Sequence, residues 1–91
     1  MSLHLVFSVQ GLNSCLQRRH PEDIVLMLDD GVYACQQWHL ANLPSKMARL
    51  LKTDADARGI SASQRGAIEA IDYDTFVALT ENHTPIVSWK D

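Results

Sequence analysis

The sequence predicts a small α/β domain with a mostly parallel sheet flanked by helices, and three observations support this fold class. Residues 24–28 form an unbroken apolar run, which is typical of a strand covered on both faces. The run stops at two acids and a glycine, after which apolar residues recur at helical spacing. Strand-like and helix-like segments then alternate along the chain. This alternation indicates crossovers between parallel strands and a Rossmann-like arrangement of three layers.

The length of 91 residues, with 46% hydrophobic and 21% charged residues, fits one domain over residues 1–91. A chain of this size buries roughly 60–65% of the surface that it exposes when unfolded, so its core is thinly covered. We therefore expect the domain to associate with other chains.

Composition and motifs also exclude several classes of function. A net charge of -3 with scattered basic residues leaves no basic face for a phosphate backbone, so we expect no direct nucleic-acid binding. No apolar run has the length of a membrane span and no leader-like segment is present, so we expect a cytoplasmic protein with no membrane contact. The chain has no GxGxxG or P-loop motif, and its four histidines are widely separated. We therefore expect no cofactor and no metal.

The first half of the chain predicts two strands joined by a helix. Residues 3–7 form a short apolar run that we interpret as the first strand. Leu12, Cys15 and Leu16 then have the spacing of a helix that faces a core, and a proline ends this helix. Residues 23–28 are the predicted central strand.

The corner Asp29-Asp30-Gly31 begins the next predicted helix, which is short. Acids near a helix start are favourable because of the helix dipole, so we interpret the two aspartates as helix caps. The alternative is a site where they act as a base or hold a ligand at the end of the strand. Residues 38–46 have no steady period and predict a crossover back to the sheet.

A weaker strand and a brief helix are predicted next. Residues 47–51 are strand-like, although Arg49 interrupts them. Thr53 would cap a helix through Arg58, and Gly59 would take the left-handed conformation at its end. Arg58 would either interact with the helix dipole or bind an anion or a partner's carboxylate.

The last third predicts a loop, two strands and a helix. Residues 61–66 are polar and predict a loop, which we expect to be the most mobile segment. Residues 67–71 predict a strand, and residues 85–89 predict a last strand or an extended tail. Between them Asp72 would cap a helix in which Tyr73, Phe76, Val77 and Thr80 recur at i, i+3, i+4 and i+7.

Cys15 is the candidate site residue. Cys15 and Cys35 are far apart and form no CxxC motif, so we expect reduced thiols. The default role of Cys15 is packing as a small hydrophobe. The alternative is a thiolate that accepts sulfur, which would need exposure and a nearby positive charge such as Arg18. Cys35 has less around it to activate a thiol, and we expect it to be structural.

Several segments, in order from one end of the chain to the other, resemble one family: Leu3-His4, residues 23–34, residues 54–59, residues 71–80 and Trp89. The sequence resembles the DsrH/TusB family of sulfur-relay subunits, which has the DsrE-like α/β fold. No single segment carries this resemblance; it rests on their order and on the length of the chain.

The resemblance implies a mainly structural subunit rather than an enzyme. In a TusBCD-like complex, three related chains form a hexamer of two trimers and pass persulfide sulfur from TusA to TusE, for 2-thiolation of the wobble uridine in certain tRNAs. The partners would be TusC-like and TusD-like chains, with the reactive cysteine on the TusD-like chain. The alternative is a DsrH-like subunit of a DsrEFH complex in sulfur oxidation. That branch carries a cysteine in its first helix, where Cys15 falls, as a persulfide carrier.

Overall fold

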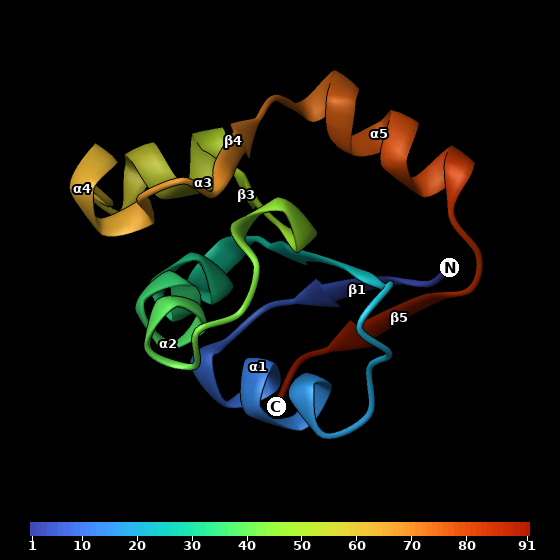
Figure 1. The fold of residues 1–91 in the computed structure, drawn as a ribbon. Coiled ribbons are helices and arrows are strands. Elements are labelled where there is room, and N and C mark those ends of the chain that lie inside the picture. The colour runs from blue at the N-terminus through green and yellow to red at the C-terminus, as the bar shows by residue number, and fades with distance from the viewer.

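The fold is a five-stranded sheet with helices on both faces, as a computed structural model of residues 1–91 shows (Figure 1). All neighbouring strands are parallel, in the order β4-β3-β2-β1-β5. The predicted α/β class is therefore confirmed, and the sheet is parallel throughout. Its strands are β1 (Leu3–Val6), β2 (Ile24–Met27), β3 (Ala48–Leu51), β4 (Glu69–Ile71) and β5 (Ile86–Trp89).

The helices form two unequal layers. One face of the sheet packs against several helices, whereas α5 is the one α-helix that packs against the other (Figure 1). The α-helices are α1 (Val9–Leu16), α2 (Cys35–Leu40), α3 (Lys52–Ala57), α4 (Ala62–Arg65) and α5 (Tyr73–Asn82), and the two 3-10 helices are η1 (Asp29–Ala34) and η2 (Ser45–Met47). No helix has both the length and the apolar character that crossing a membrane requires.

The central strand β2 explains why both faces need a cover. Successive side chains of a strand point to opposite faces, and every residue of β2 is buried. Val25 and Met27 contribute to a cluster of 14 buried residues, which also contains the wholly buried Trp38 of α2. Ile24 and Leu26 contribute to a second cluster of seven buried residues on the opposite face.

The second face is the more thinly covered one. α5 packs on it through the partly buried Phe76 and Leu79, and none of the residues of α5 is fully buried. Asp72 caps this helix by accepting a hydrogen bond from the Thr75 N–H at 2.8 Å, as predicted. One α-helix, together with Phe7 and Met47, thus covers this sheet face.

Gly31 is required where η1 crosses the end of β1. A Cβ atom at this position would lie 1.9 Å from the carbonyl oxygen of Val6, which is far closer than any side chain allows. The Leu28 N–H donates to the same carbonyl at 3.1 Å. Glycine therefore lets the chain leave β2 and pass directly over its neighbouring strand.

Residues 61–66 were predicted to form a loop, and this prediction is wrong. They contain the short helix α4, which begins at Ser61 with a capping box. The Ser61 side chain accepts from the Gln64 N–H at 3.1 Å, and the Gln64 side chain accepts from the Ser61 N–H at 2.8 Å. Two reciprocal hydrogen bonds satisfy N–H groups at the helix start, which stabilises a helix of only one turn.

The end of α2 and the start of α3 also differ from the prediction, whereas the predicted strand β3 is present. α2 continues to Leu40, because burial of Trp38 in the core favours the helix beyond the predicted start of the crossover. Thr53 does not cap α3; Leu51 precedes this helix without any side-chain cap. β3 forms despite Arg49, whose side chain pairs with Glu69 of the neighbouring β4 at 3.3 Å. Gly59 has a φ of +69°, as its predicted place after α3 requires.

Candidate functional site

Cys15 lies on the buried face of α1. Ser8 caps this helix by accepting from the Gly11 N–H at 2.9 Å, and Cys15 then faces the core beside Leu12 with no exposed surface. Burial raises the pKa of the Cys15 thiol to about 12, although the positive charge of Arg19 lowers it in part. The charge expected from Arg18 thus comes from Arg19. In this structure the thiol is protonated at neutral pH and lacks the exposure that sulfur acceptance needs.

Cys35 is also buried, at the start of α2. Its thiol donates to the Gln64 carbonyl oxygen across an S···O distance of 3.5 Å, and burial raises its pKa. The two thiols are both free, and burial is the largest effect on the pKa of each. This geometry fits the packing role expected for Cys35.

A buried hydrogen-bonded network links β5, β1 and the residue that precedes β2. Trp89 of β5 donates its indole N–H to His4 Nδ1 at 3.0 Å, and His4 Nε2 lies 2.9 Å from Asp23 Oδ2. An indole nitrogen can only donate, so His4 Nδ1 accepts and Nε2–H donates to Asp23. His4 and Asp23 are 4% and 5% exposed, which makes them the two buried polar residues of the chain.

Asp23 is the acidic member of this hydrogen-bonded network. Burial alone would raise its pKa, but hydrogen bonds from the His4 side chain and from the Ser2 and His20 N–H groups outweigh burial and lower the pKa to about 2. The Asp23 carbonyl oxygen also accepts from Arg19 at 2.9 Å. Asp23 is therefore ionised and fully bonded, which is the condition of a structural anchor rather than of a proton-transfer group.

In the sequence, His4, Asp23 and Trp89 stand out only as parts of segments that carry the family resemblance, and no pattern predicts that they meet. One signal was available: His4 stands inside an apolar strand, and a polar side chain in a strand that is covered on both faces needs a buried partner. The sequence does not indicate which residues bond to His4, because Trp89 is 85 positions away from it.

The aspartates of the corner Asp29-Asp30-Gly31 bind Arg58. Arg58 donates through Nε to Asp30 Oδ1 at 3.0 Å and through an η nitrogen to Asp29 Oδ1. The hydrogen bond to Asp30 is the largest of the effects that raise the pKa of Arg58. Neither aspartate side chain caps η1, so the interpretation as caps is wrong. Arg58 therefore pairs with carboxylates of its own chain, while both aspartate side chains remain exposed.

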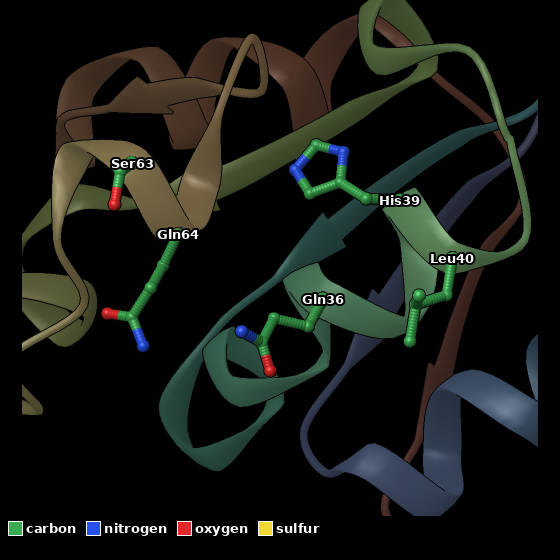
Figure 2. A pocket seen from close by; sticks show the side chains of 5 residues that line it. All are labelled: Gln36, His39, Leu40, Ser63 and Gln64. Atoms are coloured by element: carbon green, nitrogen blue, oxygen red, sulfur yellow. The ribbon is translucent and has the colours of Figure 1, made fainter.

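The one hollow on the surface lies away from this corner, between α2 and α4 (Figure 2). It has a volume of about 340 Å³ and opens to solvent. Figure 2 shows that α2 and α4 contribute its walls and that none of the lining side chains belongs to Asp, Glu, Lys or Arg. The lining residues are Gln36, His39, Leu40, Ser63 and Gln64. Nowhere in the chain do three or more potential metal-ligating side chains come together.

Known proteins resemble this chain along most of its length. The family model described as "DsrH like protein" matches residues 6–86. Protein TusB of Cronobacter sakazakii is 34% identical over 71 residues, which cover 74% of this chain and 75% of that protein. The solution structure of protein Tm0979 from Thermotoga maritima superposes with a TM-score of 0.61 and 27% identity, over 90% of this chain and 93% of that one. This chain, which has a five-stranded parallel sheet and matches the family model over residues 6–86, belongs to the DsrH-like family.

Proposed function

We propose that this chain is a mainly structural subunit of a cytoplasmic sulfur-relay complex of the TusBCD type. Such a complex passes persulfide sulfur from TusA to TusE for 2-thiolation of the wobble uridine of certain tRNAs. The similarity to a protein named TusB supports the proposal. The observation that carries the structural role is the burial of both thiols, because a chain without an accessible thiolate depends on another subunit for sulfur transfer.

The outer side of α5 is the proposed contact with TusC-like and TusD-like chains. Tyr73 and Val77 lie one helical turn apart on α5 and are 63% and 37% exposed. Ile86 of β5 is 43% exposed, and its parallel register with Leu3 places it on the sheet face that α5 covers. A partner that packs here would complete the thinner of the two layers.

Co-purification with the sister chains tests this proposal. Coexpression with TusC-like and TusD-like chains is expected to give one complex in size-exclusion chromatography with light scattering. Tyr73→Glu is expected to prevent its assembly, because burial of a new charge is costly. Tyr33→Glu is the matched control, since Tyr33 is also an exposed aromatic but belongs to η1 on the opposite layer. A stable monomer that ignores both sister chains would contradict the proposal.

The second candidate function is that of a DsrH-like persulfide carrier acting through Cys15. The positive charge of Arg19, which lowers the pKa of this thiol in part, favours it. The Cys15 thiolate would attack the outer sulfur of a donor persulfide; the donor S–S bond would break, a new S–S bond would form and the donor thiolate would leave. This step also requires α1 to expose the buried thiol.

Mass spectrometry separates the two candidates. After incubation with a cysteine desulfurase and TusA, a persulfide carrier gains one sulfur atom on Cys15, and Cys15→Ser abolishes this gain whereas Cys35→Ser keeps it. A structural subunit shows no added sulfur on either thiol. Absence of the adduct in the assembled complex would exclude the carrier function.

A further inference from the structure

The imidazole of His4 bonds to a different neighbour through each of its two ring nitrogens. Nδ1 accepts the indole N–H of Trp89 at 3.0 Å, and Nε2–H donates to the carboxylate of Asp23 at 2.9 Å. His4 is only 4% exposed, so water has little access to either nitrogen. The bond from Trp89 therefore requires a neutral imidazole that carries its proton on Nε2.

Protonation of His4 would act on these two bonds in opposite directions. A protonated imidazole has an N–H group on both ring nitrogens, and an indole nitrogen can only donate. Two donors would then face each other where Trp89 now bonds to Nδ1, so this bond would be lost. The bond to Asp23 would instead become charge-assisted, because Asp23 is already ionised. Asp23 thus holds the imidazolium in place, and Trp89 is the neighbour that has to move.

The charges around His4 are few. Side chains alternate along β1, so His4 lies on the face of the larger core cluster. The elements α1, β2 and β5 that adjoin it there contain no Asp, Glu, Lys, Arg or His, and Cys15 is their one titratable residue. Arg19 follows α1 and donates to the Asp23 carbonyl oxygen. Its charge opposes a proton on His4, whereas Asp23, in direct contact, favours it. Charged side chains at the carboxyl end of the sheet are engaged elsewhere, namely Asp29 and Asp30 with Arg58, and Lys90 with the ring of Phe7 on the opposite face.

Trp89 contributes much of the attachment of β5 to the domain. β5 is an edge strand that pairs with β1 alone. Its side chains at positions 86 and 88 are exposed, and only Val87 and Trp89 are partly buried. Trp89 packs on the larger core cluster, and its carbonyl oxygen accepts from the Phe7 N–H at 3.0 Å. Movement of the Trp89 side chain would therefore weaken the pairing at this end of β5.

We propose that protonation of His4 releases the Trp89 indole and loosens the end of β5, so that the last strand responds to pH. Histidine is the side chain whose charge ordinarily changes in the physiological pH range. Neutral His4 keeps Trp89 bonded, and protonated His4 exchanges this bond for a stronger one to Asp23. The response is local, because β1 keeps its pairing with β2 along its other edge. The proposal concerns the fold itself and holds for either candidate function.

An NMR titration of the full chain from about pH 8 to pH 5 tests the proposal. The ring signals of His4 report its protonation. The indole N–H signal of Trp89 should shift with the same midpoint as these ring signals. The indole N–H of Trp38 is the internal control: it donates to the Pro44 carbonyl oxygen at 3.1 Å, which does not titrate, so its signal should stay in place.

Hydrogen exchange measures the effect on strand pairing over the same pH range. The Phe7 amide donates to Trp89 of β5, and its protection should fall roughly two- to tenfold after correction for the intrinsic pH dependence of exchange. The Leu28 amide donates to the Val6 carbonyl oxygen on the β2 side of β1 and should keep its protection. Equal loss of protection at both amides would indicate destabilisation of the whole domain and would overturn the proposal.

Two variants assign the response to His4. His4→Gln cannot titrate at this position, so the Trp89 signal and the protection of the Phe7 amide should no longer depend on pH. His20→Gln should keep the wild-type response, since the His20 side chain is exposed and only its backbone N–H bonds to Asp23. A wild-type Trp89 signal that stays unchanged while His4 titrates would overturn the proposal, whether or not His4→Gln folds. A His4 that stays neutral down to about pH 5, or an undiminished response in His4→Gln, would do the same.

Discussion

At the scale of single residues, Asp23 couples the stability of the fold to acidity. Its folded pKa of about 2 is below the ordinary carboxyl value of 3.8, so its stabilising effect is present above about pH 4 and is lost as pH falls through about 2. This effect amounts to about 2 kcal/mol. Urea denaturation over this pH range should show the loss in the wild type. Asp23→Asn should remove this part of the pH dependence and also lower stability at neutral pH.

The neighbouring Glu22 provides the control for this experiment. Glu22 is exposed, so Glu22→Gln should keep the wild-type pH dependence. If Asp23→Asn and Glu22→Gln lose stability in acid to the same extent, the bonds from Ser2, His4 and His20 do not act as described.

Gly31 and Gly59 are needed for different reasons, so their replacement by alanine should lower the free energy of unfolding by different amounts. Gly31→Ala places a methyl group against the Val6 carbonyl and should cost at least about 3 kcal/mol, since backbone has to move. Gly59→Ala meets no atom within 4 Å but keeps a φ of +69°, so it should cost about 1 kcal/mol. The free energies of unfolding of both variants check this, and an equal cost would contradict the steric argument for Gly31.

At the scale of elements, α4 depends on its capping box. Ser61→Ala removes the acceptor for the Gln64 N–H and should cost about 1 kcal/mol. Because α4 is one turn long, the loss should appear as faster hydrogen exchange at the amides of Gln64 and Arg65. Ser63→Ala removes a 3.3 Å hydroxyl contact with Ser61 Oγ but keeps both bonds of the box, so these exchange rates should stay close to those of the wild type. Faster exchange in both variants would argue against the cap.

β2 and α4 differ in burial, and this difference decides which of them the sequence pattern predicts. The apolar run of β2 is strongly constrained by burial on both faces, so its pattern alone predicted the strand. α4 has no fully buried residue and therefore no periodic apolar signal. Its serine and glutamine at capping-box spacing were a signal, but a polar segment with a glycine was interpreted as a loop. Short elements held by side-chain hydrogen bonds are the ones that periodicity misses.

The candidate site was less predictable than the fold. Cys15 was correctly placed on a core-facing helix, but its degree of exposure depends on how closely α1 packs on the sheet, which spacing does not determine. The pairing of Arg58 with the two aspartates depends on α3 returning beside η1, and the hollow depends on α2 meeting α4. These are contacts between distant segments, and one sequence carries no direct record of them.

At the scale of the whole molecule, both thiols report on opening of the fold. Cys15 and Cys35 are buried in the same core cluster, so a thiol reagent should react with neither in the native protein. Added urea should accelerate labelling of both together if the domain opens cooperatively. The single variants Cys15→Ser and Cys35→Ser assign each rate. Immediate stoichiometric labelling of Cys15 would contradict its burial and would favour the persulfide-carrier function.

The position of β5 beside β1 has a consequence for how the chain folds. The bond between His4 and Trp89 joins residues 85 positions apart, so pairing one edge of β1 closes a loop of almost the whole chain. Contacts of such long separation slow folding, because loop closure has to precede the gain from pairing. Until β5 docks, β1 is an apolar edge strand with open backbone groups, and such edges pair readily with other chains. Pairing with β5 thus protects an edge of β1 that would otherwise be prone to aggregation.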